Sequence, residues 1–184
     1  MINHIDLSTV LRRTVCDLYS NLVTRPTGAA VRTAIETQLA ELGGRTITVI
    51  DFSNVGLLDF SCADEVVAKL LLPYCDDCPP RDAYFIFRGM TETHLDALEH
   101  VLERHHLALV LQRGDGTPTL VGAVSDAERR AWEAAVELGS GTRAEIAAHM
   151  HRPAEVADDA LGSLLRRRLV LELEDQWVAL GAPL

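Results

Sequence analysis

Lysine is almost missing from this 184-residue chain: Lys69 is the one lysine, and arginine supplies the rest of the basic charge. Acidic residues outnumber basic ones by 27 to 17, which gives a formal net charge of −10. A charge of this sign and size disfavours broad adhesion to nucleic acid or to anionic membranes. Another protein is therefore the favoured class of partner.

The sequence also lacks an apolar run near the ~20 residues that a membrane-spanning helix needs. Its start, Met-Ile-Asn-His-Ile-Asp, has neither the basic residues nor the apolar block of a secretory leader. We therefore expect a cytoplasmic protein with no membrane association, in which the four cysteines are reduced. Apolar residues make up 48% of the chain, which is enough to fill a core.

A complete metal-binding pattern is not present either. Cys75 and Cys78 have the spacing of half a zinc site, whereas Cys16 and Cys62 are isolated and form no second close pair. The adjacent pair His105–His106 would point in different directions on a helix end. We expect no metal and no cofactor.

Signatures of catalysis are equally scarce. The chain has no Gly-x-Ser-x-Gly motif, phosphate-cradling loop or dinucleotide fingerprint. Four of the seven histidines lie on or near one helical segment, where we expect them to face solvent: His94, His100, His105 and His106. Cys62, at a predicted helix start, has either a lowered pKa or, as we favour, a buried position as a small apolar residue. We therefore predict that the protein is not an enzyme, with a thiol- or metal-dependent enzyme as the remote alternative.

The most informative segment is residues 47–71. Apolar residues alternate so as to face both sides of the strand at residues 47–52, which is typical of a strand covered on both faces. A helix then begins abruptly, with Ser61 as its predicted cap and Asp64 as the reciprocal partner. Asp59 and Ser61 thus come together where a strand leads into a helix, which favours a docking or modification site.

This segment resembles the STAS superfamily, which includes the anti-sigma factor antagonists. The matching pattern is Asp-Phe-Ser-x-Val, a few apolar residues, then Ser-x-Ala-Asp-Glu, and the resemblance covers roughly residues 20–124, most specifically Val49–Leu71. It implies a small α/β domain that binds another protein, often a histidine-kinase-like ATPase or an anti-sigma-type regulator. The antagonists carry Asp-Ser-Ser/Thr-Gly at the helix start, but here Phe60 stands at the phosphoacceptor place and Cys62 replaces the glycine. The resemblance therefore supports the fold more strongly than a phosphorylation switch.

From these residues we predict a partner-binding surface on the loop at residues 54–60 and on the helix that follows. Phe60 would be an aromatic anchor of the kind that dominates binding energy. Ser61 is the candidate phosphoacceptor, although its capping role is favoured. The other predicted contacts are acidic or basic: Asp59, Asp64, Glu65 and Lys69.

Elsewhere, strands and helices alternate. Residues 5–24 predict either a strand pair or a short helix; a helix with Val31, Ile35 and Leu39 inward follows. A strand at residues 83–87, a helix from Thr91 and a hairpin formed by residues 107–112 and 119–124 complete residues 1–124. This order predicts an α/β domain with a mixed sheet.

Residues 125–184 differ in composition and form a second predicted domain. A helix at residues 126–138, a capping box from Thr142 to Glu145, a helix with Pro153 at its first position and two short strands follow one another. This order resembles a winged helix-turn-helix domain.

A winged helix usually places its second helix in the major groove of DNA, where phosphates attract basic residues. This region has seven arginines and eleven acidic residues, a balance of −4. Its basic cluster is Arg166–Arg168, which is either a nucleic-acid contact or a favourable charge at a helix C-terminus. We favour protein contact. The alternative is a DNA-binding transcriptional regulator whose STAS-like domain senses a signal or forms a homodimer.

Overall fold

The computed structural model describes residues 1–16 and 20–182. Leu18 and Tyr19, which belong to the apolar pattern of residues 5–24, lie outside the described residues. The described part of that pattern forms one strand followed directly by one helix, rather than a strand pair. Within the described residues, no helix combines the length and hydropathy that crossing a bilayer requires.

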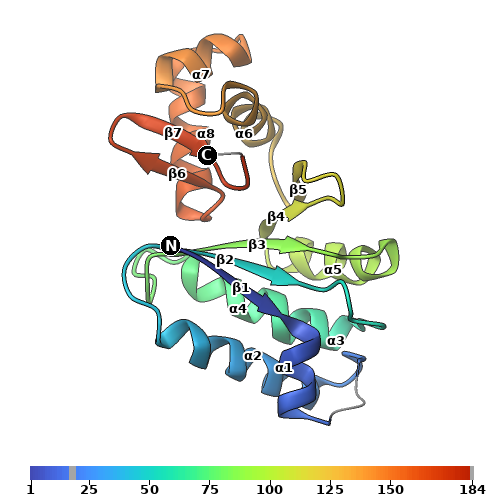
Figure 1. Cartoon of the computed structure of the whole chain (residues 1–184). Coiled ribbons are helices and arrows are strands. Elements are labelled where there is room, and N and C mark those ends of the chain that lie inside the picture. The colour runs from blue at the N-terminus through green and yellow to red at the C-terminus, as the bar shows by residue number, and fades with distance from the viewer. Residues whose placement is uncertain (17–19, 183–184) are drawn as a thin grey trace.

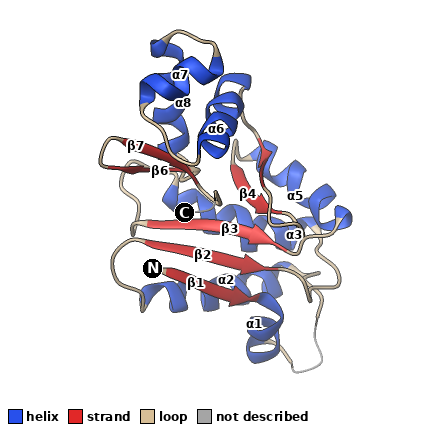
Figure 2. Cartoon of the chain, turned by 45° about the horizontal axis from the view of Figure 1, so that its top comes forward, coloured by secondary structure: helices blue, strands red, loops and turns tan. Residues whose placement is uncertain are grey.

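A mixed five-stranded sheet organises the α/β fold (Figures 1 and 2). Its strands lie side by side in chain order; the first four are parallel, and the fifth is antiparallel to the fourth. The predicted hairpin and mixed sheet are therefore confirmed. The strands are β1 (Ile2–Asp6), β2 (Thr46–Asp51), β3 (Ala83–Arg88), β4 (Ala108–Gln112) and β5 (Pro118–Gly122).

One face of this sheet is covered by the helices that connect its strands. The helix after β2 changes geometry along its length, with a π-helical turn between two α-helical segments and a final 3₁₀ turn. The elements are α1 (Leu7–Thr14), α2 (Arg25–Ala40), α3 (Phe60–Ala63), the π turn η1 (Asp64–Ala68), α4 (Lys69–Leu71), the 3₁₀ turn η2 (Leu72–Tyr74) and α5 (Glu92–Arg104).

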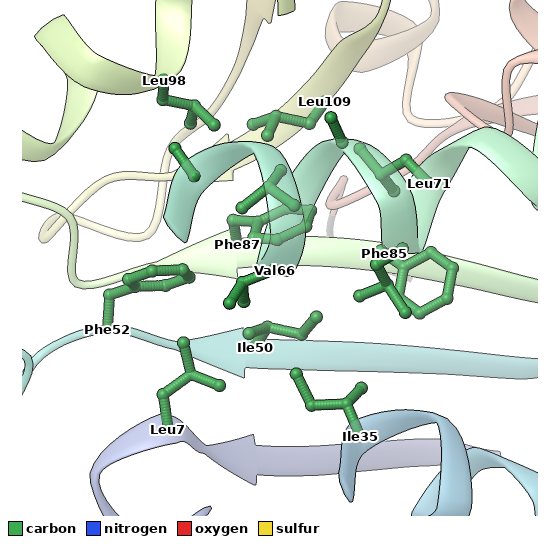
Figure 3. Packing of buried hydrophobic residues seen from close by; sticks show 14 of the residues in the cluster. Leu7, Ile35, Ile50, Phe52, Val66, Leu71, Phe85, Phe87, Leu98 and Leu109 are labelled. Atoms are coloured by element: carbon green, nitrogen blue, oxygen red, sulfur yellow. The ribbon is translucent and has the colours of Figure 1, made fainter. Parts of the chain in front are cut away.

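The core under these helices follows from the alternation of side chains along the strands. Ile50 of β2 and Phe52, which follows the strand, face the helices, and Val66 of the π turn lies directly above Ile50 (Figure 3). Phe85 and Phe87 of β3 fill the neighbouring row of the same layer. Burial of each such large apolar side chain stabilises the folded state by about 1.5–3 kcal/mol, before the entropy cost of ordering the chain is subtracted.

The other face of the sheet is covered by residues 126–182, which we call the C-terminal module (Figure 1). Val49, Ile86 and Val110 point from the sheet into a second core that contains Trp132 and Leu161 of the module. The prediction that the strand at residues 47–52 is covered on both faces is thus confirmed. The module consists of α6 (Asp126–Leu138), α7 (Arg143–Met150), α8 (Ala154–Arg166), β6 (Val170–Leu173) and β7 (Gln176–Ala179).

Local signals define the module well. The helix predicted at residues 126–138 has those bounds, Gly139 ends it at a φ of 73°, and Thr142 and Glu145 form the predicted capping box. Pro153 is the N-cap of α8 and not its first helical residue, so that prediction is wrong by one position. Gly141 pairs with Trp177 of β7 as an isolated bridge, which links the α6–α7 turn to the hairpin.

Candidate functional site

The loop between β2 and α3 is held in place by a neighbouring extended segment. The amide of Leu22 donates to the carbonyl of Leu57 at 2.7 Å, and the amide of Asp59 donates to the carbonyl of Leu22 at 2.8 Å. The Gly56 amide donates to the Ser20 carbonyl at 2.8 Å. These bonds come from chain positions more than thirty residues away. The loop is therefore fixed before any partner arrives, which lowers the entropy cost of binding.

His94 supports the same loop from α5. Its Nε2 lies 3.0 Å from the Gly56 carbonyl oxygen, and its Nδ1 lies 3.3 Å from the Thr91 amide nitrogen. The expectation that His94 faces solvent is wrong, because the ring is fully buried against Phe52. Sequence periodicity places a polar side chain outward by default. Here two backbone hydrogen bonds satisfy the ring nitrogens and make burial acceptable.

Two large apolar side chains point into solvent here, one from this loop and one from the first residue of α3. Leu57 is 54% exposed and Phe60 is 43% exposed, while their neighbours Val55 and Leu58 are buried. The loop thus anchors itself with one pair of side chains and presents the other. We call Leu57 and Phe60, with Asp59 between them, the docking loop.

The helix after the docking loop is capped by Asp59. Its Oδ1 accepts from the Cys62 amide at 2.8 Å and from the Ser61 hydroxyl at 2.9 Å. The prediction that Ser61 caps the helix is therefore wrong. A carboxylate two residues earlier reaches the free amides of the first turn and also favours the positive end of the helix. Ser61 is half-buried and supports Asp59 instead.

Asp64 and Glu65, which the sequence predicts as partner contacts, are buried: they are 6% and 3% exposed. The expectation that their side chains are open to a partner is therefore wrong. The helix is packed between α2 and α5, and Val66 and Val67 must face the core, so the acids are turned toward the neighbouring helices. Buried carboxylates require charged or hydrogen-bonding partners.

Those partners come from three elements. Arg25 Nη1 lies 2.9 Å from Asp64 Oδ2 and 2.7 Å from Glu65 Oε1, which makes it a bridge between the two acids. His105 Nε2, at the end of α5, lies 2.7 Å from Asp64 Oδ1. Arg32 and Lys69 complete the set through Glu65, Arg32 at 3.5 Å. We call these six side chains the α2–α5 ion cluster. Lys69, the fourth predicted polar contact, is thus half-buried within this cluster.

The ion cluster changes the titration of both acids. Burial by itself would raise their pKa values, but bonds from His105 and Arg25 to Asp64 outweigh it, and the pKa of Asp64 lies below its ordinary value. Glu65 follows the same pattern: burial raises its pKa, Lys69 and Arg25 lower it, and the net direction is downward. Both carboxylates are therefore held in the charged form.

Cys62 is a buried structural thiol. Burial, with a smaller contribution from the Asp59 charge, raises the pKa of Cys62 to about 11, and its Sγ donates to the Thr24 carbonyl at 2.9 Å. The favoured prediction, burial as a small apolar residue, is confirmed, and the lowered pKa is wrong. The dipole at the helix start is outweighed by the loss of water around the sulfur.

The three consecutive arginines have different surroundings. Arg166 is exposed. Arg167 Nη1 lies 3.0 Å from Glu128 Oε1 of α6, and Nη2 donates to the carbonyl of Ala123. Arg168 donates to Asp82 Oδ1 at 3.2 Å and to the Tyr84 hydroxyl at 3.1 Å. Arg167 and Arg168 therefore join the module to the sheet domain and do not present a free basic surface. Of the three, Arg166 alone is exposed, and a nucleic-acid contact by this cluster stays a prediction.

The remaining candidates stay separate. Across residues 1–16 and 20–182, no three His, Cys, Asp or Glu side chains gather in a way that could hold a metal ion. A groove of about 1020 Å³ beside α5 and the β4–β5 hairpin is lined by acids of α5 and by Arg88, Arg113 and Arg129, among others. Of the predicted partner contacts, Asp59 and Ser61 are hydrogen-bonded to each other next to Phe60. Asp64, Glu65 and Lys69 belong instead to the ion cluster.

Sequence reasoning missed Arg25, Arg32 and His105 as members of this cluster. Arg25 lies about forty residues before its partners, and nothing in its local context, Thr-Arg-Pro-Thr, indicates an ion pair. A pair of adjacent acids inside an apolar helical run was the available signal, because such acids require basic partners from elsewhere.

Comparison of the chain with protein-family models, curated proteins and solved structures finds no match.

Proposed function

We propose that this protein is a regulator that acts by binding another protein through the docking loop. The observation that carries this proposal is the exposure of Leu57 and Phe60 on a loop whose backbone is held by the segment at residues 20–22 and by His94. Apolar side chains that remain exposed on a rigid support are typical of binding surfaces, in which a few aromatic and aliphatic anchors supply most of the affinity.

The class of partner follows from the sequence resemblance. The strand, acidic cap and helix at residues 47–71 resemble the corresponding segment of the STAS superfamily, so we propose a STAS-like domain whose partner is a histidine-kinase-like ATPase or an anti-sigma-type regulator. The parallel strands and the helix capped by Asp59 are compatible with this assignment. The protein would act in the control of transcription or stress signalling, by occupying its partner and without a chemical step of its own.

Ser61 would contribute to the same surface as a support of Asp59 rather than as a phosphoacceptor. A phosphoryl group on Ser61 would stand beside the carboxylate that its hydroxyl now contacts at 2.9 Å. Two negative charges at that distance repel, and the cap of α3 would be lost. Modification of Ser61 would therefore weaken the docking loop.

The arrangement of the C-terminal module supports protein contact over DNA contact. We propose a winged helix for residues 126–182, on the order of its helices, the α7–α8 turn and the β6–β7 hairpin. The exposed side of α8 begins with Glu155, Asp158 and Asp159, which would repel phosphates. Arg143 of α7 lies close to two acids, 3.6 Å from Asp158 of α8 and 3.4 Å from Glu172 of β6.

The docking loop is tested by capture of cellular proteins on immobilised wild-type protein and variants. We expect Phe60→Ala and Leu57→Ala each to lose a protein that the wild type retains. Val156→Ala, which shortens an exposed apolar side chain on α8, is the matched control and should retain it. Equal capture by all four proteins would remove the docking loop from the mechanism. Salt-sensitive retention of random duplex DNA by the wild type would instead favour the DNA-binding alternative.

A further inference from the structure

The two edges of the sheet are finished in different ways. At the β5 edge, the bonds from Arg113 to Thr117 and from Ala123 to Leu107 show that Thr119 and Val121 turn their backbone groups toward β4. The groups facing outward then belong to Pro118, Leu120 and Gly122. Pro118 has no N–H, and the Leu120 carbonyl accepts from Arg129 Nη1 at 3.3 Å. This edge is therefore protected against pairing with a further strand.

The β1 edge has no such protection. The Ile47 amide donates to the Met1 carbonyl at 2.9 Å, so the odd-numbered residues of β1 turn toward β2, and Ile2 and His4 turn their N–H and C=O groups outward. Among the described residues, no side chain or backbone group bonds to these four polar groups. β1 carries no proline, lysine or arginine. Figure 2 shows it as the outer strand of the sheet, with no further strand beside it.

The side chains next to this edge are apolar and accessible. Ile2 is 57% exposed and lies on the face of the sheet that the C-terminal module covers. Beside it is a cleft of about 400 Å³ between the sheet and the end of the module, lined by Ile47, Val49, Leu180 and Ala182 among others. The module thus leaves the β1 side of this face open, next to an edge with unpaired backbone groups.

We infer that β1 pairs with β1 of a second copy of this chain, in antiparallel orientation, to form one continuous sheet across a twofold axis. An exposed unpaired edge in a protein at working concentration is a template for another strand. A twofold contact satisfies the same patch on both chains and closes the assembly, whereas a head-to-tail contact would leave one edge open. The strand itself places no free charge at this contact: Asp6, the one acidic or basic residue of β1 besides His4, accepts from the Ser8 amide at 2.9 Å as the cap of α1.

The position of Asp6 also selects the register. Because the strand ends where α1 begins, the outward groups available for pairing are those of Ile2 and His4. Placing Asn3 on the axis sets Ile2 opposite His4 of the second copy, and each such pair exchanges both of its N–H···O bonds. The incoming Ile2 side chain then lies on the same face as the cleft and closes its open side. Both modules lie on the same face of the extended sheet.

The mass of the wild-type protein is measured by light scattering over a range of micromolar concentrations. We expect a dimer that dissociates on dilution. Ile2→Lys adds a charge of the kind that blocks edges and should raise the dissociation constant at least about tenfold. Leu173→Lys, an equal change at an exposed apolar side chain of β6, is the matched control and should leave the constant unchanged. Circular dichroism of each variant verifies that the fold is intact.

The register is tested by cross-linking. In the proposed pair, Asn3 faces Asn3 of the second copy at a non-hydrogen-bonded position, where Cα atoms are about 4.5 Å apart and a disulfide can form. With Cys16 and Cys78 replaced by serine, Asn3→Cys should give a covalent dimer on mild oxidation, and Thr119→Cys on β5 should not. A wild-type protein that is monomeric throughout, or a dimer unaffected by Ile2→Lys, overturns the inference. A dimer that Ile2→Lys dissociates but Asn3→Cys fails to link overturns the register.

Discussion

The guanidinium of Arg168 lies over the ring of Tyr84, 5.2 Å from its centroid, and donates to the hydroxyl oxygen of the same residue at 3.1 Å. Arg168 follows α8 in the C-terminal module, and Tyr84 belongs to β3 of the sheet. The same side chain also donates through Nε to the Tyr74 carbonyl at 3.3 Å. One arginine therefore ties the module to both the central strand and the helix layer behind it.

This relationship predicts unequal effects for neighbouring arginines. Arg168→Ala removes these hydrogen bonds together with the packing on Tyr84, and we expect the free energy of unfolding to fall by about 2 kcal/mol. Arg166→Ala, an identical change at an exposed side chain, should lower it by less than about 0.5 kcal/mol. Urea denaturation followed by circular dichroism measures both values. Equal effects at the two positions would contradict the role of Arg168 as an anchor.

The ion cluster predicts a loss of stability in acid. Because the pKa values of Asp64 and Glu65 in the folded chain lie below their ordinary values of 3.8 and 4.5, the unfolded chain binds more protons in that range. The stability that these two carboxylates contribute is therefore fully present above pH 4.5 and falls as the pH drops below it. Asp64→Asn should be less stable at neutral pH, and its stability should decline less steeply in acid.

Thermal unfolding between pH 3 and pH 7 measures this slope. Glu103→Gln is the matched control, since Glu103 is an exposed acid of α5 and has no ion-pair partner within residues 1–16 and 20–182. An acid slope of Asp64→Asn as steep as that of the wild type would show that Asp64 is not held charged by its neighbours.

A steric contact at the end of β3 predicts a large effect for one glycine. Gly89 has a φ of +71°, and a Cβ added there would lie 2.2 Å from Ser53 Oγ. Gly44 has a φ of +67° with nothing within 4 Å of such a Cβ, so it has the backbone strain without the clash. We expect Gly44→Ala to cost about 1 kcal/mol and Gly89→Ala to cost more than about 3 kcal/mol. Denaturant unfolding of the two variants compares them, and similar losses would show that Ser53 moves aside freely.

The raised pKa of Cys62 predicts low reactivity in the folded protein. At pH 8 a thiol with a pKa of about 11 is almost entirely protonated, and the side chain is buried. We expect iodoacetamide to modify the exposed Cys16 and Cys78 at least about tenfold faster, as measured by peptide mass spectrometry over time. In denaturant the rates should become similar. Preferential alkylation of Cys62 in the native protein would revive the interpretation of a reactive thiol.

Local rules predicted the C-terminal module most accurately. The end of α6 at Gly139 and the capping box of Thr142 and Glu145 depend on residues within one helical turn of each other, so their physics is complete within a short window. The helix start after β2 was placed almost correctly for the same reason. Its cap was assigned to Ser61 because two capping residues, Asp59 and Ser61, stand close together, and the direction of the incoming chain selects between them.

Local patterns in the sequence were sufficient for most helices and strands, residues 5–24 excepted, and for the alternation that buries both faces of β2. The partners of the charged side chains could be identified only from the folded chain. Asp64 and Glu65 are buried because Arg25, distant in the sequence, pairs with both, and His105 pairs with Asp64. Arg167 and Arg168 are partly buried because they pair with Glu128 and Asp82, which are also distant in the sequence. Apolar periodicity is read within one element, whereas the partner of a charge is known only when elements meet.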